Sequence, residues 1–392
     1  MREPLREAPI AVSPNEVTYN RDAWVVVDLT AIAHNTRALR RWIAPAKLCV
    51  VVKADGYGHG ASPVAMAALD AGADMLAVAL VDEGITLRDA GIDAPILVLS
   101  EPPIASLDDV VGYGLTPTLY RREAIDAAAR AAQRAATVLD VHIKVDTGMH
   151  RVGAAPEDLV ELVRHVAESP YLSPAGLFTH FAVADEPDRG FTDHQSDLFD
   201  ELVAQVRRAG LPTGIVHAAN SAATMRKLAV HDLVRCGIAL YGLAPSPAVG
   251  DPLGLRPALS LRARVSFAKP VAAGEGLSYG LRYRLDTESV VATVPLGYAD
   301  GVRRILGRRG GQVLIGGRRF PIAGTITMDQ LLIDCGPDAR VSVGDEVVLL
   351  GAQGDEEIPV QEWADLLDTI TYEIVCGLSP RLPRFHQGRE RS

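Results

Sequence analysis

The sequence predicts an α/β protein, with an N-terminal (β/α)8 barrel followed by a C-terminal mainly-β domain. Short apolar runs alternate with Ala-rich, helix-like stretches from about Leu48 to Leu240, and eight such runs occur there. After about Gly250 the chain changes to short strands separated by Gly-rich turns. Nearly continuous apolar strands that alternate with helices indicate a parallel sheet covered on both faces, and eight of them fit a closed barrel.

The candidate barrel strands share an apolar character and are separated by helical patterns. In chain order they read LCVVVK, MLAVAL, PILVLS, LTPTLY, VLDVHIKV, AGLFTHF, GIVHAAN and DLVRCGI. Several of the intervening helical stretches end in Gly, the usual helix stop. An open doubly wound sheet explains the alternation equally well but the count of eight less well, and no GxGxxG follows the first strand. We therefore expect the barrel to span residues 28–250.

The second domain is expected over residues 251–392, together with a strand from within residues 17–27. Its candidate strands are SVVATVPLG, GQVLIGGRRFPIAG, QLLIDCG and VSVGDEVVLLG. A single late helix, PVQEWADLLDTITYEIVCG, is expected to carry Pro359 in its first turn and to end at Gly377. Residues 246–257 read as the linker. The early apolar run AWVVVDL could pack with either domain.

Composition and charge narrow the class of protein. The 392 residues carry a formal net charge of -10 without a block of Lys and Arg, which argues against nucleic acid or an anionic membrane as the main partner. The first residues lack the apolar core of a secretory signal, and no apolar run approaches the length of a membrane span. The four cysteines are scattered, with no spacing that indicates zinc or a disulfide framework. We therefore expect a cytoplasmic protein without a metal site.

Polar residues recur where the predicted strands end, which is where the chemistry of a (β/α)8 barrel gathers. One residue of this kind, or a group of them, follows the first, fifth, sixth, seventh and eighth strands. In chain order the residues at these strand ends are Lys53; Lys144, Asp146 and Arg151; His180; His217, Asn220 and Ser221; and Arg235 with Gly237 and Ile238, where the backbone supplies the polar groups. Any one of these residues alone is a weak indication, but their common position predicts a site.

Lys53 and its neighbours suggest the kind of cofactor. A lysine partly removed from water has a lowered pKa and can form a Schiff base as a free amine, although a lone lysine at a strand end more often simply reaches water. Ser221 at a helix start and the backbone N–H groups around Gly237 would form a phosphate cradle, while Asn220 and Ser221 could equally be ordinary helix caps.

Arg235 is the candidate partner of a ring nitrogen. As a permanent cation it would leave a pyridine nitrogen unprotonated, which weakens the ring as an electron sink and favours proton return over transamination. The alternative is that Arg235 pairs with a carboxylate such as Asp232. An attachment lysine, a phosphate cradle and a ring-nitrogen partner together are what pyridoxal 5'-phosphate requires.

These residues lie in segments that resemble the alanine racemase family, fold-type III pyridoxal-phosphate enzymes, over nearly the whole chain. The matching segments are VVKADGYGHG, HIKVDTGMHRVG, FTHFAVAD, HAANSAA, LVRCGIALYG, LSYGLRYR, VPLGYADGVRR, TMDQ and TYEIVCGLSPRLPR. Their order and spacing agree with that family. The resemblance implies racemisation of L-alanine and D-alanine, with D-alanine supplied for cell-wall peptidoglycan.

The resemblance also implies a role for each matching residue. It implies that Lys53 forms the Schiff base with the cofactor and acts as one catalytic base. It implies the following cofactor contacts: Tyr57, Ser221, Gly237, Ile238 and Tyr372 at the phosphate, His180 stacked on the ring, and Arg235 at the ring nitrogen with His217 behind it. Arg151 would contact the cofactor's phenolic oxygen and the substrate carboxylate, and a carbamylated Lys144 would hold Arg151 in place.

The second base implied by the resemblance is Tyr298 in GYADG. Racemisation removes the α-proton from one face and returns a proton to the other, so two bases on opposite faces are needed. In this family the partner subunit supplies the tyrosine, so we expect an obligatory homodimer. Met328, with Asp329 beside it, would reach the substrate carboxylate from that subunit. A tyrosine base requires a cationic neighbour, for which His180 and Arg235 are candidates.

The chain departs from the family pattern in GTITMDQ, where Thr325 and Thr327 stand at positions that often hold an Arg and a Cys. This difference leaves the charge of the substrate entrance open. Two other functions share part of this pattern. A broader racemase, for example one that acts on serine, fits the same motifs, because a small pocket excludes larger side chains only weakly. A non-catalytic carrier of the cofactor would not need the second base, and no cysteine-centred decarboxylase motif is found.

Overall fold

The computed structural model describes residues 21–388, which form two compact units. One unit is continuous and comprises residues 31–256; the other combines residues up to Thr30 with those from Pro257 onward. Residues 17–20 and 389–392, which the expected second domain included, lie outside the described residues. Asp28, expected to begin the barrel, is the last residue of the first strand of the other unit.

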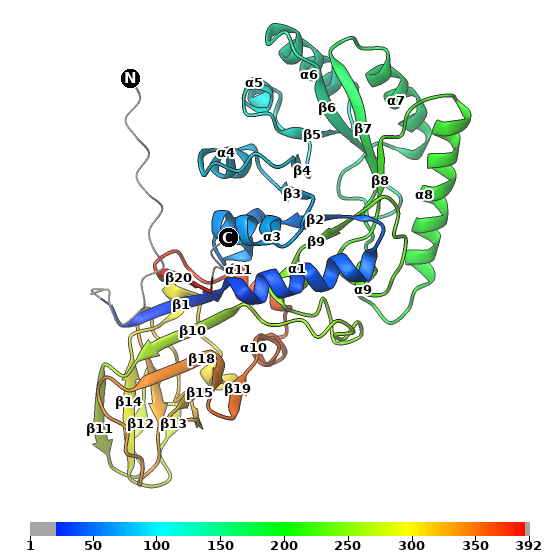
Figure 1. Cartoon of the computed structure of the whole chain (residues 1–392). Coiled ribbons are helices and arrows are strands. Elements are labelled where there is room, and N and C mark those ends of the chain that lie inside the picture. The colour runs from blue at the N-terminus through cyan, green and yellow to red at the C-terminus, as the bar shows by residue number, and fades with distance from the viewer. Residues whose placement is uncertain (1–20, 389–392) are drawn as a thin grey trace, which may run out of the picture. The chain divides into compact units, whose positions relative to one another are not determined.

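The continuous unit is an eight-stranded parallel barrel, as predicted (Figure 1). Its strands run in the order β8-β7-β6-β5-β4-β3-β2-β9. They are β2 (Lys47–Val51), β3 (Met75–Val78), β4 (Ile96–Val98), β5 (Thr116–Leu119), β6 (Leu139–Lys144), β7 (Leu172–Phe178), β8 (Ile215–His217) and β9 (Leu233–Cys236). The backbone N–H of Asp232 donates to Val216 O at 3.0 Å, and the N–H of Arg235 donates to Ala219 O at 3.0 Å, so β8 and β9 close the ring.

Helices connect the strands and cover the outside of the barrel. They are α1 (Leu29–Ile43), α2 (Lys53–Tyr57), α3 (Ala61–Asp70), α4 (Val81–Asp89), η1 (Ile104–Ser106), α5 (Leu107–Gly112), α6 (Arg122–Arg134), η2 (Pro156–Asp158), α7 (Leu159–Ala167), α8 (Gly190–Arg208), α9 (Ser221–Met225) and η3 (Ile238–Tyr241). The Ala-rich sequence of α6 buries Ala124, Ile125, Ala128 and Ala131 on one face, at the spacing of an amphipathic helix. Strands β2, β3 and β4 are almost wholly buried, as expected for strands covered on both faces.

The other unit is built mainly of strands. They are β1 (Ala23–Asp28), β10 (Leu259–Arg264), β11 (Phe267–Val271), β12 (Gly276–Leu277), β13 (Tyr283–Arg284), β14 (Ser289–Val294), β15 (Gln312–Ile315), β16 (Arg318–Pro321), β17 (Leu331–Asp334), β18 (Glu346–Gln353), β19 (Glu356–Ile358) and β20 (Arg384–Gln387). The largest sheet has the order β16-β15-β18-β10-β1-β20. The early run AWVVVDL therefore belongs to this unit, because β1 pairs antiparallel with β10 and parallel with β20.

The late helix is divided in two, so the expected single helix is wrong. This unit contains the turns η4 (Tyr298–Asp300) and η5 (Gly307–Arg309) and the helices α10 (Val360–Leu367) and α11 (Thr371–Cys376). Asp368 has φ of 54°, in the left-handed region, and the N–H of Thr369 bonds back to Ala364 O at 3.0 Å, which ends α10. Pro359 precedes the first turn of α10 instead of lying in it.

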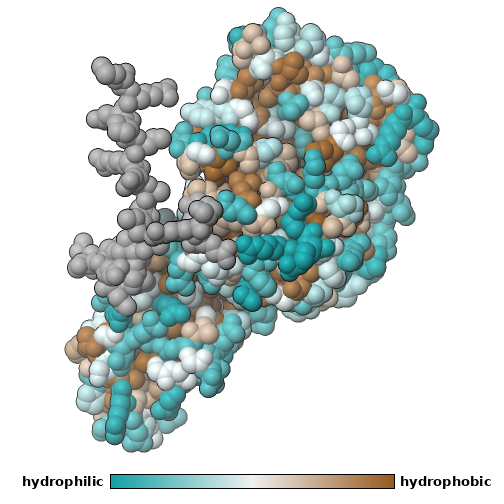
Figure 2. Space-filling view, viewed as in Figure 1, coloured by the Kyte–Doolittle hydropathy of each residue, from teal (hydrophilic) through white to brown (hydrophobic). Residues whose placement is uncertain are grey.

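The described surface is mixed in character. On the face shown in Figure 2, hydrophilic residues are interspersed with apolar ones. In the part of the chain that the structure describes, no helix is long and apolar enough to cross a membrane.

Candidate active site

The barrel gathers polar side chains at the carboxyl ends of its strands. Lys144 and His217 are the last residues of β6 and β8, and Arg235 lies in β9. Lys53 and His180 follow two residues after the ends of β2 and β7. Because all eight strands are parallel, these ends share one edge of the barrel.

Lys53 is positioned by an unusual left-handed turn. It opens α2, in which Ala54, Asp55 and Gly56 have φ of 52°, 51° and 61°, and Tyr57 continues with φ of 53°. L-residues rarely adopt this conformation in succession, since each left-handed residue other than Gly costs about 1–2 kcal/mol. Such strain persists only where the surrounding structure holds it, and it is typical of functional sites.

Two carboxylates hold this turn in place. The Ala54 N–H donates to Glu83 Oε1 at 2.7 Å, while Oε2 of the same side chain accepts from Ala79 N at 2.8 Å. Asp55 Oδ1 accepts from Ala61 N at 2.8 Å. Glu83 is not predictable from the sequence, because nothing in its local pattern distinguishes it from other acidic residues in the first turn of a helix.

Tyr57, Ser221 and Gly237 come together next to the start of η3. Tyr57 is buried, and its hydroxyl lies so close to Gly237 that a Cβ at that position would collide with it. Ser221 Oγ accepts from the backbone N–H of Gly237 at 2.9 Å, and Ile238 is the first residue of η3. Asn220 is the cap of α9, since its side chain accepts from Ala223 N at 3.0 Å. The structure therefore makes Asn220 a helix cap and directs Ser221 toward the glycine turn.

Arg235 is buried among nitrogen and carbonyl groups. Its Nη1 donates to His217 Nδ1 at 2.8 Å, and its Nη2 donates to His180 Nδ1 at 3.0 Å. Nη2 also reaches the carbonyl oxygens of Thr179 and Ala218, both at 2.9 Å. Burial lowers the pKa of Arg235 to about 10, which leaves it protonated at neutral pH.

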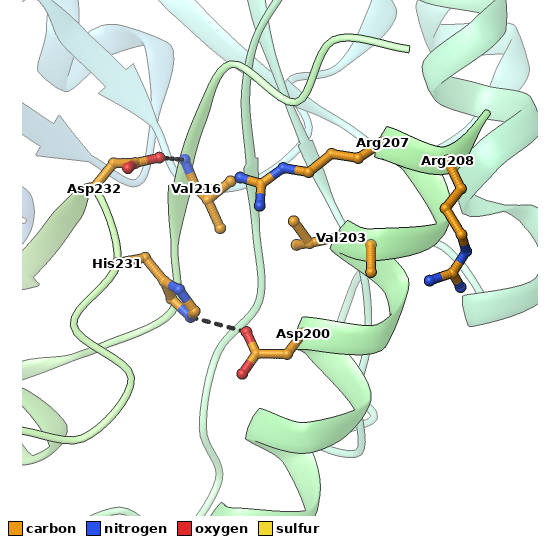
Figure 3. A pocket seen from close by; sticks show the side chains of 8 residues that line it. Asp200, Val203, Arg207, Arg208, Val216, His231 and Asp232 are labelled. Carbon is orange, nitrogen blue, oxygen red and sulfur yellow. Dashed lines mark hydrogen bonds and ion pairs between the residues drawn. The ribbon is translucent and has the colours of Figure 1, made fainter. Parts of the chain in front are cut away.

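The alternative pairing of Arg235 with Asp232 is wrong. The Asp232 carboxylate instead accepts from the backbone N–H of Val216 at 2.8 Å, at the opposite ends of the strands. Asp232 lines a pocket of about 590 Å³, which is shown in Figure 3. No residue of the predicted site lines this pocket. His231 lies in that pocket with its Nε2 3.6 Å from Asp200 Oδ1. The pocket lies at the amino-terminal end of the strands, and in a (β/α)8 barrel the residues at that end contribute to stability and not to catalysis.

Lys53, Lys144, Arg151, His180 and Arg235 form a cluster at the strand ends, and this cluster carries an excess of positive charge. The pKa of Lys144 is lowered to about 8, first by burial and then by the charges of Arg151 and Arg235, with a smaller contribution from Lys53. The pKa of His180 is lowered well below its usual value, first by burial and then by the same cations. Four cations therefore lie within electrostatic range of one another. This arrangement is suited to bind an anionic small molecule.

His142, which is not among the predicted site residues, also lies next to this cluster. Its Nδ1 lies 2.9 Å from His217 Nε2. It stands two residues before Lys144 in β6, and alternate residues of a strand point to the same face. That spacing was the available signal, because it places both side chains on the same side of the barrel wall.

The remaining predicted residues lie in the β-rich unit. Tyr298 begins η4 and is 42% exposed, and its N–H donates to Thr327 O at 3.0 Å. The N–H of the next residue donates to Met328 O at 3.1 Å, so the two loops lie side by side. The hydroxyl of Thr327 donates to Gln330 O at 2.8 Å and closes its own loop. Met328 is exposed.

Several neighbouring residues stabilise these loops. Asp300 is fully buried, and its Oδ1 accepts from Arg21 Nη1 at 2.6 Å. Asp329 pairs with Arg381 at 2.8 Å, and Thr325 is buried with its hydroxyl 3.3 Å from Tyr279 O. Tyr372 is the second residue of α11. No local pattern indicates the pairing of Arg21 with Asp300, because the two residues are far apart in the chain.

A (β/α)8 barrel with a basic cluster at the carboxyl edge of its strands is typical of an enzyme that binds an anionic small molecule. Comparison with known proteins identifies the family. The family model "Alanine racemase, N-terminal domain" matches residues 27–245, and "Alanine racemase, C-terminal domain" matches residues 258–386. The chain belongs to the alanine racemase family, which makes it an isomerase.

Individual relatives agree over nearly their full length. The alanine racemase of Symbiobacterium thermophilum is 47% identical over 369 residues, covering 94% of this chain and 98% of that protein. The crystal structure of alanine racemase from Bacillus anthracis with bound L-Ala-P has a TM-score of 0.88 at 40% identity and covers 95% of this chain and 97% of that one. A histidine racemase from Leuconostoc mesenteroides subsp. sake has a TM-score of 0.86 at 29% identity, covering 97% of this chain and 100% of that one.

Proposed function

We propose that this protein interconverts L-alanine and D-alanine with pyridoxal 5'-phosphate as cofactor, and that the D-alanine supplies cell-wall peptidoglycan synthesis in the cytoplasm. The observation that carries the proposal is the buried, donor-only guanidinium of Arg235 inside a cluster of cations at the barrel's carboxyl edge. The family membership adds the reaction, and the B. anthracis structure was solved with L-Ala-P bound.

The residues present fit the cofactor. Tyr57, Ser221, Gly237 and Ile238 would hold its phosphate, because Gly237 leaves the backbone bare beside the Tyr57 hydroxyl. The family resemblance adds Tyr372 to these residues. Arg235 would donate to the ring nitrogen, His180 would stack on the ring, and Lys53 would attach the aldehyde. When bound, the cofactor withdraws electrons from the α-carbon of the amino acid and so acidifies its proton.

Arg235 determines how far that electron withdrawal goes. A guanidinium has only donors, so it keeps a ring nitrogen that accepts from it unprotonated. Its pKa of about 10 means that it stays charged at physiological pH. The limited electron withdrawal favours return of the proton to the same carbon, which is racemisation, over transamination.

Two side chains would move the α-proton. Lys53 would take or return it on one face, and Tyr298 of the partner subunit would do so on the other. The exposed position of Tyr298 on its own unit is consistent with a role in a site completed by a second chain. A homodimer would then be required for activity, with Met328 and Asp329 entering the site from that second chain.

Arg151 would bind the substrate carboxylate, and Lys144 would orient it. The lowered pKa of Lys144, about 8, leaves a substantial fraction of neutral amine near physiological pH. A neutral amine adds carbon dioxide and releases a proton to give a carbamate. The resulting anion would pair with Arg151 and offset part of the positive charge of the cluster.

The proposal is tested by purifying the protein and recording its absorbance with and without added pyridoxal 5'-phosphate. We expect absorbance in the range of a protein-bound pyridoxal Schiff base, lost in Lys53→Ala, and formation of D-alanine from L-alanine by the wild type. A protein that stays colourless with added cofactor would exclude every cofactor-based function proposed here.

A broader substrate range is the second candidate, because the histidine racemase shares the fold over the full length of that chain. The same assay with L-serine and L-histidine decides it. Comparable kcat/KM values for alanine and either of these substrates would show a racemase of broad specificity instead of one specific for alanine.

A further inference from the structure

The barrel interior contains a hydrogen-bonded chain of three side chains, which runs from His142 through His217 to Arg235. His142 in β6 contacts His217 in β8 through Nδ1 and Nε2 at 2.9 Å, and His217 Nδ1 lies 2.8 Å from Arg235 Nη1. These side chains are at most 3% exposed. The chain therefore runs through the core of the barrel, where an unmade hydrogen bond is costly.

The direction of each hydrogen bond is fixed by elementary chemistry. A guanidinium has donors and no acceptor, so His217 Nδ1 accepts from Arg235 as long as the guanidinium keeps this position. A neutral imidazole carries one proton, so His217 then carries it on Nε2 and donates it to His142 Nδ1. The chain thus requires an acceptor at the position of His142 Nδ1.

The surrounding residues hold the imidazoles of His142 and His217 in place. Gly176 in β7 pairs with His142 across the sheet, and a Cβ at Gly176 would lie 2.5 Å from the His142 ring, so only glycine leaves room for it. The Phe178 ring stacks on His217 with centroids 4.6 Å apart and an interplanar angle of 9°. The Arg235 guanidinium carbon lies 5.1 Å from the same Phe178 ring. The histidine and the arginine are therefore supported by one aromatic side chain.

We propose that His142 is a positioning residue, which accepts the Nε2 proton of His217 and thereby fixes the orientation of the Arg235 guanidinium toward the cofactor's ring nitrogen. The cofactor part of this inference rests on the proposed function. Without the acceptor, His217 can move its proton to Nδ1, which places two donors against each other at Arg235. Nη1 of Arg235 must then move away from His217. Nη2 stays in place because three acceptors hold it, so the guanidinium turns about that atom.

Two variants of similar size separate this role from simple packing. In His142→Asn the side-chain oxygen takes the position of Nδ1 and can accept the same proton, whereas His142→Leu removes the acceptor. A third variant, Gly176→Ala, keeps His142 but displaces its ring. The tautomer of His217 is read by ¹⁵N NMR of histidine-labelled protein without cofactor, with His217 signals assigned by their loss in His217→Gln. The dissociation constant of pyridoxal 5'-phosphate is measured by titration of the same samples.

We expect a neutral His217 with its proton on Nε2 in the wild type and in His142→Asn, and loss of that single tautomer in His142→Leu and Gly176→Ala. The dissociation constant of pyridoxal 5'-phosphate should rise about tenfold in His142→Leu and return to near the wild-type value in His142→Asn. An unchanged His217 tautomer in a folded His142→Leu, or equal effects of Asn and Leu, would overturn the inference. Failure of the wild type to bind pyridoxal 5'-phosphate would overturn the proposed function and the cofactor part of this inference, while the NMR result would still decide whether His142 sets the tautomer.

Discussion

Acidification from pH 7.5 to pH 5.0 should destabilise the fold through its buried histidines. Burial, with a smaller contribution from the charge of Arg235, lowers the pKa of His142 from 6.5 to about 4. Between these two values the unfolded chain binds a proton that the folded chain does not. The free energy of unfolding therefore falls as the pH drops through 6.5, and it continues to fall until the pH reaches about 4.

The share of His142 in this loss follows from the pKa difference. One pKa unit corresponds to about 1.4 kcal/mol, so the loss at pH 5.0 relative to neutral pH is about 2 kcal/mol. His180 and His217 have pKa values lowered well below 6.5, mainly by burial, and act in the same direction. The total loss for the wild type should therefore exceed the share of His142.

Urea unfolding followed by tryptophan fluorescence measures this loss at pH 7.5 and 5.0. The protein concentration is held fixed, because association of subunits changes the apparent stability. His142→Asn is the matched control, since asparagine does not titrate and keeps an acceptor in place. The variant should lose about 2 kcal/mol less than the wild type on acidification. An identical pH dependence of the two proteins would refute the assignment of a buried, neutral His142.

Three further predictions concern the site. In Tyr298→Phe, exchange of the α-hydrogen with D2O should fall by roughly 100-fold or more for one enantiomer of alanine and much less for the other; small, equal effects would contradict a two-base site. With ¹³C-bicarbonate, NMR should show a carbamate carbon that disappears in Lys144→Arg and on lowering the pH well below both physiological pH and the Lys144 pKa of about 8; persistence of the signal in the variant would place the carbamate elsewhere. In Ala54→Gly, relief of the left-handed conformation should exceed the added freedom of the unfolded chain and raise the free energy of unfolding by about 0.5–1 kcal/mol; an unchanged urea midpoint would show that Ala54 is not strained.

The pattern of apolar runs was sufficient to predict the barrel. Each of the eight candidate runs overlaps one of the strands β2 to β9, although β7 begins three residues before its run, because a strand buried on both faces is largely apolar along its length. The division of the late helix was not predictable in the same way. Its break depends on Asp368 in a left-handed conformation, and an Asp at that position is equally compatible with a continuing helix.

The candidate site was predicted to the extent that it depends on strand ends. Polar residues that follow parallel strands must share one edge, and the structure places Lys53, Lys144, His180 and Arg235 within electrostatic range of one another. The supporting contacts were not predictable, because they join residues distant in sequence. Glu83, which holds the turn after Lys53, belongs to this group. The roles of all these residues in catalysis stay predictions until the experiments above are done.

The position of β1 also affects how the protein is made. This strand leaves the ribosome early, yet its two neighbours, β10 and β20, begin only at Leu259 and Arg384. All strands of the barrel are encoded between them, so the barrel can form while Val25–Val27 still lack their sheet. The nascent chain must keep this apolar segment from aggregating until β20 has also been synthesised. A circular permutant that begins at the barrel and carries β1 at the other end would remove that delay, and it should fold with less dependence on chaperones.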